Sequence, residues 1–145
     1  MFNFALGTAQ FSNNYGITRN YDSSEIIDTR KILITASKQG IEMIDTAASY
    51  DNALKLLGAN NSLDFKIFSK FDHRSPNFKS ILDDLNKQLK LLSLDCIEGL
   101  LCHDLSYVFD NKDFILEANE LKNKGKIRYF GVSIYSIEDL KALID

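Results

Sequence analysis

Short apolar runs alternate along this chain with longer stretches in which apolar residues recur at helical spacing. Each run is short enough to be a strand, and the runs cover residues 4–6, 41–45, 65–70, 96–102 and 127–132. The amphipathic stretches predict helices after Ser136 and at about 25–39, 53–57, 77–92 and 114–122. Ser23 and Ser24 are expected to cap the first helix, and Pro76 to begin the third. The alternation predicts about five parallel βα units.

The length of the chain and the residues at its strand ends favour different folds. The 145 residues are expected to form a single domain, residues 1–145. A closed TIM (β/α)8 barrel needs eight units and typically about 250 residues, so length alone favours an open, doubly wound sheet of five strands. The residue types that follow the predicted strands, described below, favour a barrel instead. We therefore predict an α/β fold in the form of a partial TIM barrel, incomplete at about five parallel βα units.

Composition places the chain among soluble globular proteins, with 45% hydrophobic and 26% charged residues. A net charge of −3 and a pI near 5.4 provide no basic field for nucleic acid or for an anionic membrane surface. The first residues lack the basic and apolar segments of a signal peptide, and no apolar run reaches membrane-spanning length. We therefore expect a cytoplasmic protein that binds neither nucleic acid nor membrane.

The cysteines and one histidine are expected to have no chemical role. Cys96 and Cys102 are too few for a disulfide framework and form no C-x-x-C pair, so we expect buried, reduced thiols and no metal site. His73 lies beside Arg74 in a polar stretch and is expected to be an exposed loop residue.

Ionisable residues close three successive predicted strands. Asp45 ends the second strand, Lys70 ends the third and His103 follows the fourth, while Tyr50 lies in the loop just after Asp45. The carboxyl ends of parallel strands meet at one rim, where α/β barrels place their chemistry. Strand alternation puts His103 on the opposite face from Cys102, which argues against a Cys–His dyad. The sequence therefore predicts four polar side chains at one rim.

These four residue types suit the protonation of a carbonyl group. A tyrosine has an unperturbed pKa of about 10, and a neighbouring lysine cation lowers it because the cation favours the phenolate. A buried lysine needs an anionic partner, which Asp45 can supply. His103 can donate a hydrogen bond that orients the carbonyl. Each residue alone is more often a cap, a solvated charge or core packing, so the prediction depends on all four together.

Five motifs, in order along the chain, resemble those of the aldo-keto reductase family. Residues 40–50, GIEMIDTAASY, resemble the family pattern G-x-x-x-x-D-T-A-x-x-Y. Lys70 in FSK and His103 in LLCHD resemble the family's strand-end lysine and histidine. Residues 125–133, GKIRYFGVS, resemble G-K-I-R-x-x-G-V-S, and the residues LGT at 6–8 resemble the turn on the cofactor side. The resemblance implies the amino-terminal part of that family's TIM barrel.

The resemblance also implies roles for particular residues. Four residues would be catalytic: Asp45, Tyr50, Lys70 and His103. Tyr50 would be the general acid, Lys70 and Asp45 its tuning pair, and His103 the orienting residue. Four residues would bind the nicotinamide end of the cofactor, NADPH as is usual in this family or NADH: Gly7, Thr8, Asp45 and Ser133. The substrate would be a small-molecule aldehyde or ketone.

The chain also departs from the family pattern. Asp51 and Asn52 follow the tyrosine where the family usually has glycine first, and Ile134 stands where asparagine usually follows Ser133. The family's later strands, which hold most of the cofactor, are absent from these 145 residues. Two functions therefore stay open: one part of an NAD(P)H-dependent reductase, or a catalytically inactive truncated remnant or binding scaffold. The edge strands further predict self-association or pairing with a complementary half-barrel chain.

Overall fold

The chain forms one parallel sheet covered by helices. The structure, a computed structural model, describes residues 4–11, 28–50, 52–74, 78–111 and 113–144. Its strands are β1 (Ala5–Gly7), β2 (Met43–Asp45), β3 (Lys66–Phe71), β4 (Ile97–Cys102) and β5 (Ile127–Val132). Its α-helices are α1 (Thr29–Lys38), α2 (Ala53–Gly58), α3 (Ile81–Leu92), α4 (Leu105–Asp110), α5 (Phe114–Asn123) and α6 (Ile137–Ile144), with short 3-10 turns η1 (Ala9–Phe11) and η2 (Asn61–Leu63). None of the described helices is long and apolar enough to cross a membrane.

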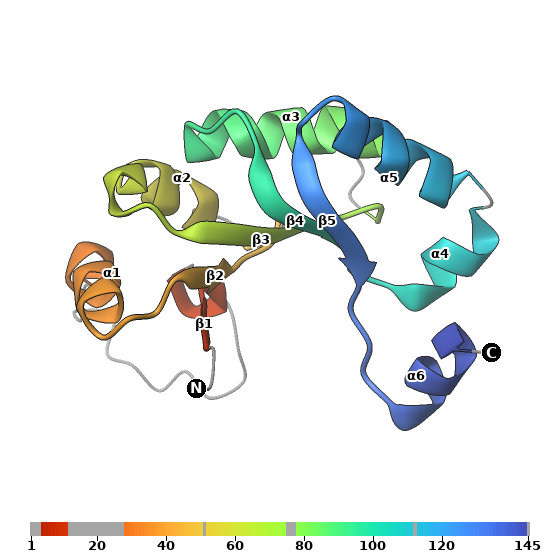
Figure 1. Ribbon diagram of the computed structural model, residues 1–145, viewed down its shortest axis with the longest axis horizontal. Coiled ribbons are helices and arrows are strands. Elements are labelled where there is room, and N and C mark those ends of the chain that lie inside the picture. Colours follow the sequence, from red (N-terminus) through yellow and green to blue (C-terminus); the bar gives the residue numbers. More distant parts are fainter. Residues whose placement is uncertain (1–3, 12–27, 51, 75–77, 112, 145) are drawn as a thin grey trace.

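The strand order distinguishes a barrel segment from a doubly wound sheet. The strands lie in sequence order, β1-β2-β3-β4-β5, and every neighbouring pair is parallel. A doubly wound sheet reverses its order at a switch point and carries helices on both faces. Here α1, α2, α3 and α5 form an arc around the outside of a curled sheet (Figure 1). The five βα units therefore form part of a TIM barrel, and the open doubly wound sheet that length alone favoured is wrong.

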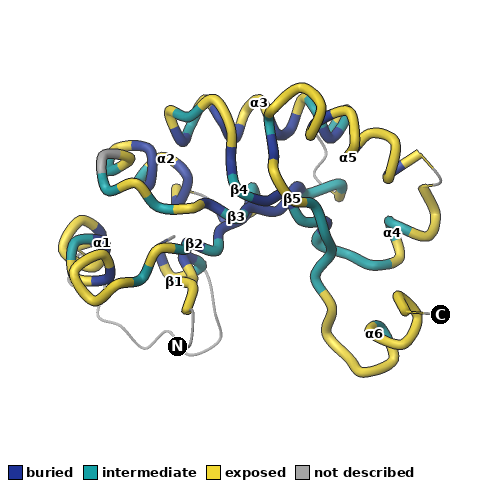
Figure 2. The backbone as a smooth tube through the Cα atoms, viewed as in Figure 1, coloured by how far each residue is buried: buried dark blue, intermediate teal, exposed yellow. Residues whose placement is uncertain are grey.

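The hydrophobic core lies between the sheet and the arc of helices. Outward-pointing strand residues such as Ile44, Ile67 and Leu100 are buried against helix residues such as Leu85 and Leu89. Burying one such side chain contributes about 1.5–3 kcal/mol relative to an exposed position. Figure 2 shows the buried positions on the helix faces turned toward the sheet, whereas α6 is exposed over most of its length.

Helices α2, α5 and α6 begin where they were predicted to begin, whereas the starts of α1 and α3 differ from those predicted. The described part of the first helix begins at Thr29, with Asp28 as its cap: the side chain of Asp28 accepts a hydrogen bond from Lys31 N at 3.0 Å. The predicted caps Ser23 and Ser24 lie outside the described residues, as does Pro76. The third helix begins at Ile81 and not near residue 77, because Ser80 is extended and its side chain caps the helix by accepting from Asp83 N.

One helix was not predicted, and four of the five strands have bounds one or two residues away from the predicted ones. Helix α4 was not predicted, because its six residues are too few to show a helical period; the Asp104 side chain caps it by accepting a hydrogen bond from Ser106 N. Strand β2 begins at Met43 and not at residue 41, because its three residues pair with the three residues of β1. The predicted fifth strand, residues 127–132, is confirmed.

Candidate functional site

The predicted site residues lie at the carboxyl edge of the sheet. Asp45 pairs with Gly7 at the ends of β2 and β1, and Lys70 pairs with Leu101 near the ends of β3 and β4. Asp45 also pairs with Phe68, so Lys70, two residues further along β3, extends from the same face. His103 directly follows β4, and the hydrogen bond from Ser133 N to the carbonyl of Cys102 (2.9 Å) continues the ladder beyond β5.

Lys70 and Asp45 form the predicted ion pair. The Lys70 Nζ lies 2.6 Å from Asp45 Oδ1 and also donates a hydrogen bond to the carbonyl of Thr46 at 3.0 Å. The side chain of Lys70 is 9% exposed and that of Asp45 is 38% exposed. A buried ammonium ion requires such partners, because it has lost most of its hydration. The pair therefore fixes a positive charge just beneath the rim while leaving the carboxylate within reach of solvent.

Tyr50 lies in a turn between β2 and α2 that hydrogen bonds hold in place. Its N–H donates to the carbonyl of Ala47 (3.1 Å), and its own carbonyl accepts from Ala53 N (2.8 Å). The residue is 8% exposed, and Lys70 Nζ lies 5.4 Å from the centroid of its ring. The lysine ammonium therefore contacts both the Asp45 carboxylate and the ring of Tyr50. Asp51, where the family pattern changes, lies outside the described residues.

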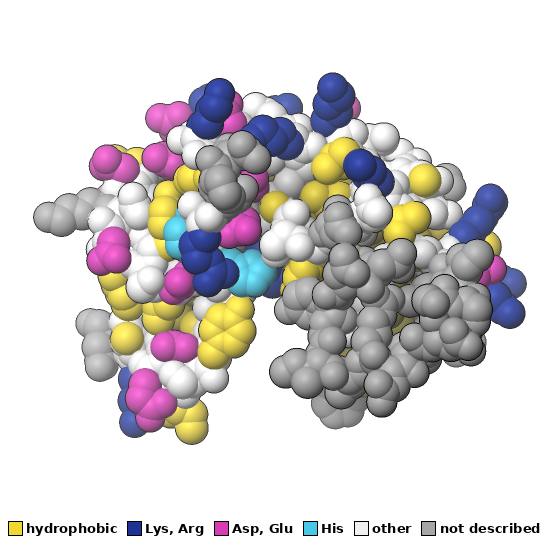
Figure 3. Space-filling model, turned by 180° about the vertical axis from the view of Figure 1, so that it is seen from behind, with side chains coloured by type: hydrophobic (Ala, Val, Ile, Leu, Met, Phe, Trp, Pro, Cys, Tyr) yellow, Lys and Arg dark blue, Asp and Glu magenta, His cyan; other side chains and the backbone are white. Residues whose placement is uncertain are grey.

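His103 is partly buried beside positive charges. Burial lowers the pKa of His103 below its usual 6.5, and the cations of Lys70 and Arg74 lower it further. The imidazole is therefore uncharged at neutral pH and has one N–H to donate. Figure 3 shows the two histidine side chains of the chain on one face, with a Lys or Arg side chain beside them.

The residues predicted to bind a cofactor differ in accessibility. Both the N–H and the hydroxyl of Thr8 donate to the carbonyl of Asp45, each at 3.0 Å, and Thr8 is fully buried. Gly7 is exposed, and a Cβ added there would meet nothing within 4 Å. Ser133 is partly exposed at the end of β5. The structure therefore leaves Gly7 and Ser133 open to a ligand, whereas Thr8 ties β1 to β2.

Two expectations about other residues are wrong. His73 is only partly exposed, because the ring of Tyr107 on the unpredicted helix α4 covers it at a centroid distance of 4.4 Å. Cys96 is exposed and not buried. Cys102 is buried as expected, and burial raises the pKa of its thiol. Among the described residues, no group of three or more His, Cys, Asp and Glu side chains is arranged to hold a metal ion.

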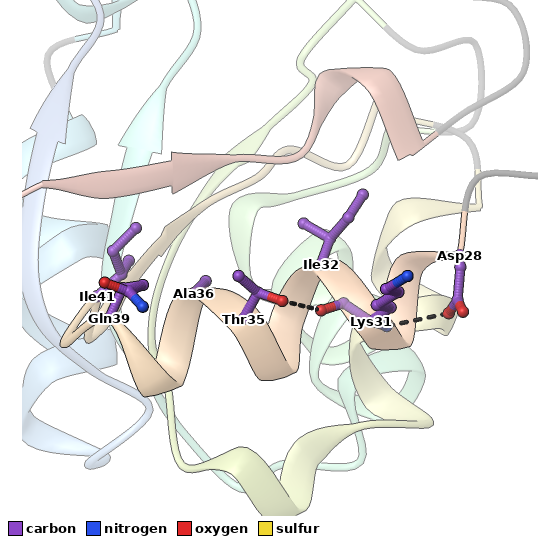
Figure 4. Close-up of a pocket in the computed structure, with 7 residues that line it drawn as sticks. All are labelled: Asp28, Lys31, Ile32, Thr35, Ala36, Gln39 and Ile41. Atoms are coloured by element: carbon purple, nitrogen blue, oxygen red, sulfur yellow. Dashed lines mark hydrogen bonds between the residues drawn. The ribbon is translucent and has the colours of Figure 1, made fainter.

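The described chain also has an apolar recess away from these residues. It lies along α1, has a volume of about 520 Å³, and is lined by Asp28, Lys31, Ile32, Thr35, Ala36, Gln39 and Ile41 (Figure 4). None of the predicted catalytic residues lines it. The recess follows the side of α1.

Sequence reasoning missed a buried polar residue behind the site. Gln88 of α3 is almost completely buried and contacts the end of β3. Its signal was present in the sequence, because Gln88 falls on the apolar face of the helix between Leu85 and Leu92. A polar residue at such a position normally has hydrogen-bond partners inside the protein.

Comparisons with known proteins agree with this geometry. The profile described as the aldo/keto reductase family matches residues 3–144. Similar solved structures include the aldo-keto reductase PA4992 from Pseudomonas aeruginosa, with 27% sequence identity and a TM-score of 0.75 over 97% of this chain and 59% of that chain. Another is the aldo-keto reductase AKR11C1 from Bacillus halodurans in its holo form, with 21% identity and a TM-score of 0.72 over 98% of this chain and 49% of that one.

A third structure, an aldo-keto reductase from Klebsiella pneumoniae in complex with NADPH, has 23% identity and a TM-score of 0.66 over 97% of this chain and 48% of that chain. No curated protein matches the sequence. The chain thus spans about half to three fifths of the length of these relatives. With the profile matched over nearly its whole length and the barrel segment formed, the chain belongs to the aldo-keto reductase family.

Proposed function

We propose that this chain provides the proton-donating half of an NADPH-dependent reductase of aldehydes or ketones. The observation that supports this most directly is the position of the Lys70 ammonium. It lies 2.6 Å from the Asp45 carboxylate and 5.4 Å from the centroid of the Tyr50 ring, at the carboxyl edge of the sheet. A cation held beside a phenol stabilises the phenolate and so favours release of the phenol proton.

Tyr50 would give its hydroxyl proton to the substrate carbonyl oxygen as the carbonyl carbon is reduced. The resulting phenolate would be stabilised by Lys70, whose own charge Asp45 balances, until solvent returns the proton. His103, uncharged at neutral pH, would donate its N–H to the same carbonyl oxygen and so orient the substrate. The lowered pKa of His103 suits this role, because it leaves Tyr50 as the proton donor.

The exposed groups at the rim fit one end of a nicotinamide cofactor. Asp45 presents a partly exposed carboxylate suited to ribose hydroxyls, and Ser133 and the backbone of Gly7 are accessible beside it. A bound reduced nicotinamide would supply the hydride for the carbonyl carbon. NADPH is favoured over NADH because the Klebsiella relative was solved with NADPH. Thr8 would shape this end through the Asp45 backbone, since its hydroxyl proton is already donated.

A chimaera tests the proposal directly. Residues 1–145 would be fused to the two fifths of PA4992 that the alignment leaves uncovered, with intact PA4992 as the positive control. We expect the chimaera to consume NADPH in the presence of an aldehyde or ketone that intact PA4992 reduces. Tyr50→Phe should lower the rate by roughly 100- to 10,000-fold, the usual contribution of a general acid. The fall in absorbance of the reduced nicotinamide measures the rate.

The outcomes separate the two functions that the sequence left open. An active chimaera that loses activity in Y50F supports the reductase. An active chimaera in which Y50F reduces carbonyls at an unchanged rate contradicts the assignment of Tyr50. A folded chimaera that consumes no NADPH supports a catalytically inactive scaffold. An assay of the 145-residue chain by itself shows whether the five strands consume NADPH without the part supplied by PA4992.

A further inference from the structure

A buried chain of polar side chains crosses the apolar interface between α3 and β3. Gln88 donates through Nε2 to Asp84 Oδ2 at 2.7 Å and to the backbone carbonyl of Lys70 at 3.3 Å. Its Oε1 accepts a hydrogen bond from the hydroxyl of Ser69. Ser69 is fully buried, Gln88 is 1% exposed and Asp84 is 9% exposed. Both ends of the glutamine amide are therefore held inside the protein.

Packing alone does not explain this polar chain. Gln88 lies between Leu85 and Leu89, and both of these bury apolar side chains against the sheet. Apolar residues at positions 69, 84 and 88 together would extend the same surface and leave no side-chain polar group to satisfy. Burial raises the pKa of Asp84, and the hydrogen bond from Gln88 acts against that rise. Keeping a carboxyl group and an amide here therefore indicates a role beyond packing.

The polar chain ends on the backbone that holds the candidate site. The carbonyl of Lys70 accepts from Gln88 Nε2 and also from Ala48 N at 2.9 Å. Lys70 supplies the ammonium that contacts Asp45, and Ala48 lies two residues before Tyr50. One carbonyl oxygen therefore joins α3, the end of β3 and the turn that contains Tyr50.

We propose that Gln88, oriented by Asp84 and Ser69, is a positioning residue that holds the Lys70 ammonium against Asp45 and Tyr50. It acts through the backbone, because Ser69 and Lys70 point to opposite faces of β3 and Gln88 approaches from the helix side. The expected effect of Gln88 on catalysis rests on the proposed function. The effect of Gln88 on the position of the Lys70 ammonium does not, and it can be measured without turnover.

Four variants of the full chain separate positioning from general stability. Gln88→Leu removes all three hydrogen bonds at similar volume. Asp84→Asn keeps an acceptor for Gln88 Nε2 and is the conservative rescue. Leu85→Met is the matched control, because it alters an equally buried neighbour on the same helix at nearly constant volume. Ser69→Ala removes a single hydroxyl, and it provides the test if Gln88→Leu does not fold.

The first measurement is the ammonium resonance of Lys70 in a chain labelled with ¹⁵N-lysine, identified by its loss in Lys70→Arg. We expect Gln88→Leu to shift or broaden this resonance beyond its linewidth, and Ser69→Ala to do so to a smaller extent. Asp84→Asn and Leu85→Met should leave it unchanged. A Lys70 resonance that is the same in all four variants overturns the proposal.

The second measurement is turnover in the chimaera with PA4992. Gln88→Leu should lower kcat by up to about 100-fold with KM nearly unchanged, because a misplaced acid-tuning pair affects the transition state more than substrate binding. An active chimaera whose kcat is equal in Gln88→Leu and Leu85→Met contradicts positioning. An unsubstituted chimaera without activity instead contradicts the proposed function, and the Lys70 resonance then decides the positioning proposal by itself.

Discussion

At the scale of single residues, one ammonium ion connects the groups of the candidate site. Lys70 Nζ contacts the Asp45 carboxylate, the Thr46 carbonyl and the ring of Tyr50, and its charge also lowers the pKa of His103. Removing or moving this charge should therefore change the ionisation of more than one neighbour. The ionisation of Tyr50 and that of His103 can be measured separately.

Replacing Lys70 by Met should make the Tyr50 phenol ionise at higher pH than in the unsubstituted chain. The reason is the loss of the cation that favours the phenolate. Ultraviolet difference titration against the Tyr50→Phe version of each protein isolates this one of the six tyrosines. Lys66→Met is the matched control, because Lys66 lies on the same strand but pairs with Glu42. Equal titration in Lys70→Met and Lys66→Met would show that Lys70 does not tune Tyr50.

His103 should make the chain less stable in mild acid. Its pKa is below 6.5 in the folded chain, so the unfolded chain binds this proton first as the pH falls. The chain keeps its full free energy of unfolding, as far as His103 is concerned, above pH 6.5. It loses part of that free energy as the pH falls from 6.5 to the pKa that His103 has in the folded chain. Urea unfolding across this range should show a smaller loss of free energy of unfolding for His103→Gln. An identical pH slope in both proteins would contradict a lowered pKa.

At the scale of elements, close contact between neighbouring helices supports the strands from outside. Helix α2 ends at Gly58, where a Cβ would lie only 2.1 Å from the carbonyl oxygen of Leu91 on α3. Leu91 O is a backbone atom and cannot rotate away as a side chain can. Gly58 is therefore required by the approach of the two helices and not by its own dihedral angles, and α2 in turn carries the turn of Tyr50 at its start.

Gly58→Ala should destabilise the chain by about 1–3 kcal/mol, the usual cost of overpacking. Helix propensity alone predicts the opposite sign, because alanine in a helix is favoured over glycine by about 0.5–1 kcal/mol. Chemical denaturation gives the free energy of unfolding. Ala59→Gly, at the exposed neighbouring position, reports the effect of exchanging alanine and glycine on the backbone without the contact to Leu91. Stabilisation by Gly58→Ala would mean that the two helices separate without cost.

At the scale of the whole molecule, the described sheet has two open edges. β1 and β5 each have one strand neighbour in the part of the chain that the structure describes, whereas a closed barrel leaves no edge. Large apolar side chains are exposed at both ends of the sheet, among them Phe4 near β1, Tyr129 on β5 and Leu140 on α6. Exposed edges and apolar patches of this kind favour pairing with another chain.

We therefore expect the purified 145-residue chain to self-associate at micromolar concentration, as measured by sedimentation velocity. Tyr129→Lys should weaken association, because Tyr129 is 59% exposed on an edge strand and an added charge there opposes strand pairing. Leu116→Lys is the control, since it adds the same charge at an exposed apolar position of helix α5 and not on a strand. A compact monomer at every concentration would show that the edges are protected.

The sequence by itself determined the order of elements and the identity of the candidate site. Apolar runs located all five strands, because a buried strand needs several consecutive apolar residues. Strand alternation and the parallel sheet then brought Asp45, Lys70 and His103 to one edge, as the motifs predicted. These features depend on local patterns and on which residue follows each strand. The order of the amino acids alone is therefore enough to predict them.

Only the tertiary structure decided the features that depend on contacts between distant segments. The strand order and the single arc of helices excluded the doubly wound sheet, which has the same alternation of elements. Tyr107 covers His73 from a helix too short to show a period, and Gln88 reaches the carbonyl of Lys70 across 18 positions of sequence. Local patterns contain no information on which groups meet across such separations. The contacts that hold Lys70 and cover His73 therefore could not be predicted from the sequence and are seen only in the folded chain.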